Sequence, residues 1–115
     1  MPLTIYHNPR CSKSRQTLNL IKEAGVDVEI IRYLDTPLTQ EDISGLLSKL
    51  GFSSAQQLMR KGEAIYKELG LKTETREDKL LLALKSHPKL IERPIVVKGD
   101  SAILGRPPEN VTKFL

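Results

Sequence analysis

The N-terminal segment constrains the fold most, because it combines two strand patterns with one helical pattern. Residues 3–6 alternate between apolar and polar side chains, and an Asn-Pro turn follows at residues 8–9. Residues 12–24 carry apolar side chains at helical spacing, and Gly25 then favours a helix end. Residues 26–30 alternate again. This order predicts a βαβ unit with two parallel strands.

The middle of the chain is dominated by helical patterns. Three pairs of residues have the spacing of a capping box at a helix N-terminus: Thr39 with Asp42, Ser54 with Gln57, and Thr75 with Asp78. Apolar side chains follow the first and the third pair at helical spacing, and the second pair opens a short helix. Gly51, Gly70 and Pro88 mark the expected helix ends.

The C-terminal part of the chain has the pattern of a hairpin. Two short apolar runs, residues 94–98 and 101–104, are separated by Gly99 and Asp100, a pair suited to a two-residue turn. The prolines at residues 107–108 then favour the start of a last short helix.

The complete order of elements predicts an α/β fold with a mixed four-stranded sheet, in which a βαβ half is followed by a ββα half. The helices of the middle segment, at about residues 38–91, form an insertion between these two halves. Residues 1–115 contain no linker, repeat or low-complexity segment, so we expect a single domain.

The composition is that of a globular protein, with 39% hydrophobic and 28% charged residues. The start of the chain lacks the basic and apolar segments of a signal peptide, and no stretch has the ~18 apolar residues of a membrane span. We therefore expect a cytoplasmic protein without a membrane partner. The net charge of +4 is spread along the chain and suits a small anion. No nucleic-acid-binding signature is present, so nucleic acid is not an expected partner.

Cys11 is the single cysteine of the chain. An internal disulfide is therefore impossible, and redox chemistry at Cys11 would need a thiol from another molecule. Its predicted place is the N-terminus of the first helix, where partial positive charge and unpaired N–H groups favour a thiolate. Arg10, Lys13 and Arg15 add positive charge close by. These features predict a nucleophilic thiolate. The two histidines are far apart in sequence, so no zinc site is expected.

Several motifs, in order along the chain, resemble those of one family. The run from His7 to Arg15 lies between the first strand and the first helix, and short motifs around Arg60, Arg93 and Arg106 follow it. In these motifs the chain is similar to the glutaredoxin-linked arsenate reductases, and the resemblance covers essentially all of it. It implies a thioredoxin/glutaredoxin-like fold and a cis peptide bond before Pro94, which would lie beside the cysteine.

The resemblance also implies roles for individual residues. Cys11 is the implied nucleophile. Three arginines are implied to surround the oxyanion: Arg60, Arg93 and Arg106. Five further residues are expected to support the site: His7, Asn8, Ser14, Arg15 and Pro94. Ser14 stands where a Cys-x-x-Cys protein has its second cysteine, and we expect its hydroxyl to donate a hydrogen bond to the Cys11 sulfur.

The implied reaction is the reduction of arsenate to arsenite. Because the chain has no second cysteine, glutathione is the expected co-substrate and glutaredoxin the expected reductant. We expect no tightly bound cofactor, no metal and a monomeric protein.

Two other functions remain open from the sequence. Redox-responsive regulators that bind RNA polymerase share this fold, but they typically carry Cys-x-x-Cys, which Ser14 interrupts. A generic glutathione-linked thiol-disulfide oxidoreductase would share Cys11 and need no arginines. A phosphatase-like reductase with a Cys-x5-Arg loop is excluded, because Thr17 occupies the arginine position. Arg93 and Arg106 have support beyond the resemblance, since they flank the predicted hairpin, whose turn would bring them together.

Overall fold

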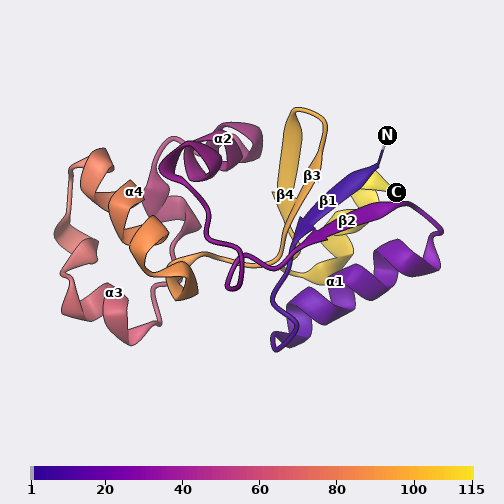
Figure 1. The fold of residues 1–115 in the computed structure, drawn as a ribbon, viewed down its shortest axis with the longest axis horizontal. Coiled ribbons are helices and arrows are strands. Elements are labelled where there is room, and N and C mark those ends of the chain that lie inside the picture. Colours follow the sequence, from indigo (N-terminus) through magenta and orange to yellow (C-terminus); the bar gives the residue numbers. More distant parts are fainter. Residues whose placement is uncertain (1) are drawn as a thin grey trace. The chain divides into compact units, whose positions relative to one another are not determined.

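Four short strands form one mixed sheet in the computed structural model, which describes residues 2–115. The strands are β1 (Leu3–Tyr6), β2 (Val28–Ile31), β3 (Ile95–Lys98) and β4 (Ser101–Leu104). Their order across the sheet is β2-β1-β3-β4 (Figure 1). β1 is parallel to β2 and antiparallel to β3, and β3 is antiparallel to β4. The predicted α/β fold with a mixed sheet is confirmed, although β2 begins at Val28 and not at residue 26.

Helix α1 (Ser12–Glu23) and the 3₁₀ helix η4 (Pro108–Phe114) pack on one face of this sheet. One cluster of buried apolar side chains joins them to β1 and β3: Leu3, Ile5, Leu18, Ile21, Val96 and Val111. Gly25 follows α1 with a φ of 72°, a left-handed conformation that glycine adopts without steric cost. The predicted stop of the first helix is confirmed, and the packed face holds the N-terminus of α1 in place.

The β3–β4 hairpin forms as the sequence predicts. Lys98 pairs with Ser101 across the turn, and Ile95 pairs with Leu104 at the open end. Because the strands are antiparallel, the residues just before β3 and just after β4 emerge at the same end of the hairpin.

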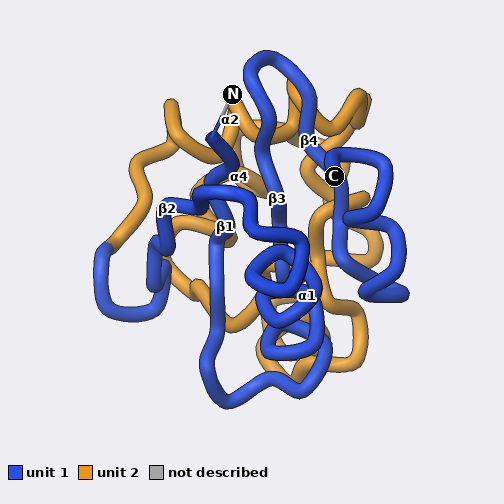
Figure 2. Tube along the Cα trace, turned by 90° about the vertical axis from the view of Figure 1, so that its right-hand side faces the viewer, with its two compact units in different colours: residues 1–36, 93–115 blue, residues 37–92 orange. Residues whose placement is uncertain are grey.

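The chain divides into two compact units (Figure 2). One contains the sheet, in the described residues up to Thr36 and in residues 93–115; the other contains residues 37–92. This second unit covers nearly the same residues as the predicted helical insertion at 38–91. That the whole chain acts as one domain stays a prediction.

The second unit consists of short helices. They are α2 (Gln40–Leu50), η1 (Ala55–Leu58), α3 (Ala64–Glu68), η2 (Leu71–Thr73), α4 (Glu77–Ser86) and η3 (Pro88–Leu90). Helix α4 packs against α2, η1 and η3. The core of this second unit contains fully buried aliphatic side chains, among them Ile43, Leu58, Leu80, Leu84 and Leu90.

Two of the three predicted capping boxes are present, and the prediction of the third, at Thr75, is wrong. The Thr39 hydroxyl accepts a hydrogen bond from Asp42 N at 3.0 Å, and the Asp42 carboxylate accepts one from Thr39 N at 2.9 Å. Ser54 and Gln57 form the second box, at the start of η1.

At α4 the cap residue is Arg76, not Thr75, and its side chain makes no capping hydrogen bond. The physical reason is local competition. The Glu74 carboxylate accepts hydrogen bonds from the amides of Thr75 and Arg76, and the Asp78 carboxylate pairs with the Arg76 guanidinium at 2.9 Å. The groups that would form the Thr75 box are therefore engaged elsewhere.

Candidate active site

Cys11 is the N-cap residue of α1, with φ −90° and ψ 124°. The turn that delivers it is built on Asn8, which is buried. Asn8 O accepts a hydrogen bond from Cys11 N at 3.0 Å, and Asn8 Oδ1 accepts one from Arg10 N at 3.0 Å. Asn8 therefore fixes the backbone of the turn, which gives a physical basis for its expected supporting role. The predicted position of Cys11 at a helix N-terminus is confirmed.

Below this turn lies a buried polar pair. Nδ1 of His7 is 2.7 Å from the Ser14 hydroxyl oxygen, which also accepts a hydrogen bond from Asn8 N at 3.0 Å. His7 and Ser14 are 5% and 0% exposed. The Ser14 hydroxyl therefore serves His7 and Asn8, and the expectation that it donates to the Cys11 sulfur is wrong.

The environment of His7 disfavours its charged form. Burial lowers the pKa of His7, and the positive charges of Arg32, Lys22 and Arg15 lower it further. The imidazole is therefore neutral at neutral pH, and its Nδ1 can accept the proton of the Ser14 hydroxyl.

The Cys11 thiol is half-buried and its pKa lies below its ordinary value. Burial alone would raise the pKa, but the backbone N–H of Ser14, the hydrogen bond and positive charge of the Arg93 side chain, and the backbone N–H of Lys13 together outweigh it. The Cys11 side chain makes no capping hydrogen bond to α1. These groups therefore act on the thiolate, as expected for a cysteine at a helix N-terminus.

Arg93 and Arg106 meet at the open end of the hairpin. Arg106 Nη1 donates a hydrogen bond to Arg93 O at 3.1 Å, so the predicted juxtaposition of these two residues is confirmed. Arg93 Nε is buried and has no hydrogen-bond partner within residues 2–115. A buried donor without a partner costs about 1–3 kcal/mol, so it is a candidate for contact with a bound anion.

The Arg93–Pro94 peptide bond is cis, as the resemblance implied, and the Arg106–Pro107 bond is also cis, which was not predicted. Pro94 O accepts a hydrogen bond from Gly105 N at 2.9 Å. The two arginines are thus held by a backbone link between the segments that precede β3 and follow β4.

Two further arginines have distinct surroundings. Arg15 Nη1 donates to Pro9 O at 3.0 Å, which fastens α1 to the turn before Cys11. Arg60 lies in the helical unit, where it pairs with Glu63 at 3.4 Å and with Glu92 at 3.8 Å. The role of Arg60 at the oxyanion site stays a prediction.

Within residues 2–115, no group of three or more His, Cys, Asp or Glu side chains is arranged to hold a metal ion. In the same residues, none of the helices combines the length and apolar character needed to cross a membrane.

Known proteins resemble this chain along its whole length. A sequence profile of the ArsC family matches residues 6–114. An uncharacterised protein of Escherichia coli strain K12, YfgD, is 52% identical over 112 residues, which cover 96% of this chain and 94% of that protein. A Neisseria meningitidis protein named arsenate reductase is 46% identical over 114 residues, which cover 98% of this chain and 97% of that protein.

The same similarity holds in three dimensions. The solved structure of a protein named arsenate reductase from Vibrio cholerae superimposes with a TM-score of 0.96 at 46% identity, covering 100% of this chain and 98% of that one. The predicted thioredoxin/glutaredoxin-like fold is thereby confirmed.

Proposed function

Because the chain belongs to the ArsC family, we propose that it is an arsenate reductase in which Cys11 is the nucleophile. The observation that carries this proposal is the Arg93 guanidinium beside the Cys11 sulfur, where it helps to lower the pKa of the thiol. Arg106 is hydrogen-bonded to the same segment through Arg93 O. A thiolate and two guanidinium groups are the combination needed to attack a bound oxyanion.

The arginines offset the electrostatic repulsion between arsenate and the thiolate. Arsenate is an anion at neutral pH, so an approaching thiolate is repelled unless fixed cations neutralise the site. A guanidinium stays charged and can bind two oxyanion oxygens through its planar fork. In the proposed site Arg93 and Arg106 bind arsenate and stabilise the charge that develops as the As–S bond forms.

The proposed reaction uses external thiols, because Cys11 is the single cysteine. The Cys11 thiolate attacks arsenic, and one oxygen leaves as hydroxide or water. Glutathione displaces a second oxygen and forms a second As–S bond. A glutaredoxin thiolate then attacks the glutathione sulfur, and the electron pair of that As–S bond passes to arsenic, which is reduced from the +5 to the +3 state.

The remaining steps close the cycle. Water cleaves the bond between Cys11 and arsenic, releasing arsenite and the free thiol. A second glutathione reduces the mixed disulfide left on glutaredoxin, so two glutathione thiols are converted to one disulfide for each arsenate. The cytoplasmic location and the monomeric state stay predictions.

The test is NADPH consumption in the presence of arsenate, glutathione, glutaredoxin and glutathione reductase, with the wild type and Cys11→Ser compared. We expect turnover in the wild type and none above background in the variant. Arg93→Ala and Arg106→Ala should each lower turnover by about 10²–10³, the usual cost of losing one donor to a developing oxyanion. Turnover retained by Cys11→Ser would show that the proposed nucleophile is wrong.

The same variants separate this function from its alternatives. A generic thiol-disulfide oxidoreductase would cleave a glutathione mixed disulfide, and that activity would survive Arg93→Ala and Arg106→Ala. A regulator would bind RNA polymerase stably and show no arsenate turnover under any of these thiol conditions.

A further inference from the structure

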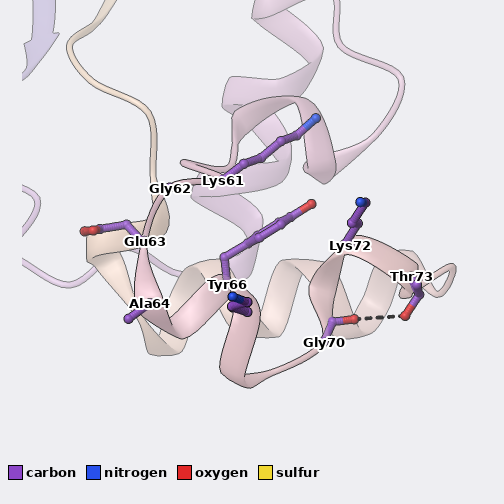
Figure 3. Close-up of a pocket in the computed structure, with 9 residues that line it drawn as sticks. Lys61, Gly62, Glu63, Ala64, Tyr66, Gly70, Lys72 and Thr73 are labelled. Atoms are coloured by element: carbon purple, nitrogen blue, oxygen red, sulfur yellow. Dashed lines mark hydrogen bonds between the residues drawn. The ribbon is translucent and has the colours of Figure 1, made fainter.

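A cavity of about 480 Å³ lies in the helical unit, around α3 and η2. Three lysines contribute to its lining: Lys61, Lys67 and Lys72. A second cavity of about 540 Å³ shares Lys61, Tyr66 and Lys72 with it. We call the space lined by Lys61, Tyr66, Lys67 and Lys72 the basic cavity; Figure 3 shows it.

The charge of the basic cavity is not balanced by its own acidic residues. Within residues 2–115, none of its lysines has a carboxylate oxygen within 4.0 Å. Glu63 also lines it, but its carboxylate pairs with Arg60 at 3.4 Å. Glu74, in the second cavity, is engaged by the backbone amides of Thr75 and Arg76.

Partly buried hydrogen bonds hold the wall between the lysines. The side chain of Tyr66 is 7% exposed, and its hydroxyl donates to Gln56 Oε1 at 3.0 Å. Gln56 Nε2 in turn donates to Leu71 O. Figure 3 shows Lys61, Tyr66 and Lys72 extending toward the same side, with the Glu63 carboxylate pointing away from them. Two ammonium groups thus stand next to one fixed polar wall.

We propose that the basic cavity binds a small organic phosphate. Its volume falls in the range of about 300–1,000 Å³ that is typical of sites for small organic ligands, so it is larger than an inorganic oxyanion requires. Lysine binds phosphate as a point charge, and a phosphate dianion matches two lysine ammonium groups better than a single carboxylate does. The Tyr66 oxygen, whose proton is used by Gln56, can accept a hydrogen bond from the body of the ligand.

The experiment is a titration of the full chain followed by its backbone amide NMR signals, with ribose 5-phosphate as the probe and ribose as the neutral control. Lys61→Ala combined with Lys72→Ala is the test variant. Lys49→Ala combined with Lys85→Ala is the matched control, because it removes the same charge from exposed lysines of the same unit that do not line the basic cavity. All four lysines are exposed, so both variants should fold.

We expect saturable shifts for residues 61–73 with ribose 5-phosphate and none with ribose. The test variant should bind at least about tenfold more weakly, and the control variant within about twofold of the wild type. Raising the salt concentration should weaken binding in the wild type.

Three results would overturn the proposal. The first is the absence of saturable shifts in residues 61–73. The second is equal affinity of the wild type and the test variant, including the case in which only Cys11, Arg93 and Arg106 shift because the probe enters the candidate active site. The third is equally tight binding of glutarate, which would show that the basic cavity does not select phosphate over carboxylate.

Discussion

Nδ1 of His7 lies 2.7 Å from the Ser14 hydroxyl, and this buried contact joins the end of β1 to the first turn of α1. The same hydroxyl accepts the N–H of Asn8, the residue whose side chain and carbonyl shape the turn before Cys11. One hydroxyl, three residues after the nucleophile, therefore contacts two polar groups that precede it. Its contribution to the site is to hold this turn, while the Ser14 backbone N–H acts on the sulfur.

Replacing Ser14 by alanine should destabilise the protein by about 1–3 kcal/mol, because the buried His7 Nδ1 and Asn8 N–H lose their common partner. The free energy of unfolding in urea measures this. Ser12→Ala is the control, since Ser12 is exposed on the same helical turn and should change stability by less than about 0.5 kcal/mol. Equal stability of the two variants would contradict the role given to the buried hydroxyl.

The lowered pKa of His7 predicts a pH-dependent stability. In the range between the folded pKa and the unfolded value of about 6.5, the unfolded chain binds more protons than the folded chain. The contribution of neutral His7 to the free energy of unfolding is therefore fully present above the pKa of His7 in the unfolded chain. It is lost as the pH falls from there through the pKa of His7 in the folded chain. Urea unfolding at successive pH values should show this loss in the wild type and a shallower dependence in His7→Gln. A wild-type dependence in His7→Gln would refute the assignment.

Removing the Arg93 guanidinium should raise the pKa of Cys11, because its hydrogen bond and charge favour the thiolate. The midpoint of the pH dependence of iodoacetamide alkylation measures the change. Arg93→Ala should move the midpoint upward and Arg93→Lys should move it less, since lysine keeps the charge without the planar fork. Arg10→Ala should move the midpoint less than Arg93→Ala does, because Arg10 is exposed and is not among the main groups that lower the pKa of Cys11. An unchanged midpoint in Arg93→Ala would show that Arg93 does not lower the pKa of Cys11.

Much of the fold could be predicted because its signals are local in sequence. Alternating side chains marked the strands, Gly25 and Gly51 marked helix ends in the left-handed conformation, and Gly99 with Asp100 fixed the hairpin turn. The position of Cys11 at a helix N-terminus and the meeting of Arg93 with Arg106 followed directly from these elements. Such features depend on residue type and spacing, which a sequence displays.

What could not be predicted depends on backbone groups or on contacts between distant segments. The amides of Lys13 and Ser14 act on the Cys11 sulfur, but any residue except proline would supply an amide there. The sequence predicts a contact of the Ser14 hydroxyl with Cys11, because Cys-x-x-Cys proteins place a thiol at this position, but the hydroxyl lies 2.7 Å from Nδ1 of His7 instead. The contact of Thr17 with Gly105 spans 88 positions of the chain and left no pattern in the sequence.

The two threonine caps test how local competition decides a helix start. Thr39→Ala should destabilise the protein by about 0.5–2 kcal/mol, because the Asp42 amide loses its capping hydroxyl. Thr75→Ala should cost less than about 0.5 kcal/mol, because α4 begins after Arg76 without a cap from Thr75. Urea unfolding of both variants measures the difference. A larger loss of stability in Thr75→Ala would mean that Thr75 does cap α4.

Alanine substitutions at Gly105 and Gly45 should change the stability of the protein in opposite directions. A Cβ atom at Gly105 would lie 2.7 Å from Cγ of Pro94 and would also meet the Thr17 side chain, so Gly105→Ala should destabilise the protein by about 1–3 kcal/mol. A Cβ at Gly45, inside α2, meets no atom within 4 Å, so Gly45→Ala should stabilise it by up to about 1 kcal/mol.

The substitution Gly105→Ala should also raise the pKa of the Cys11 thiol. Gly105 N is bonded to Pro94 O, next to the Arg93 side chain that lowers the pKa of Cys11. Displacing Pro94 should therefore weaken this interaction and raise the midpoint of Cys11 alkylation in Gly105→Ala, with no change in Gly45→Ala. If Gly105→Ala lost stability but kept the wild-type midpoint of Cys11 alkylation, Gly105 would matter for packing only. The position of Arg93 would then depend on its hydrogen bond with the Arg106 side chain.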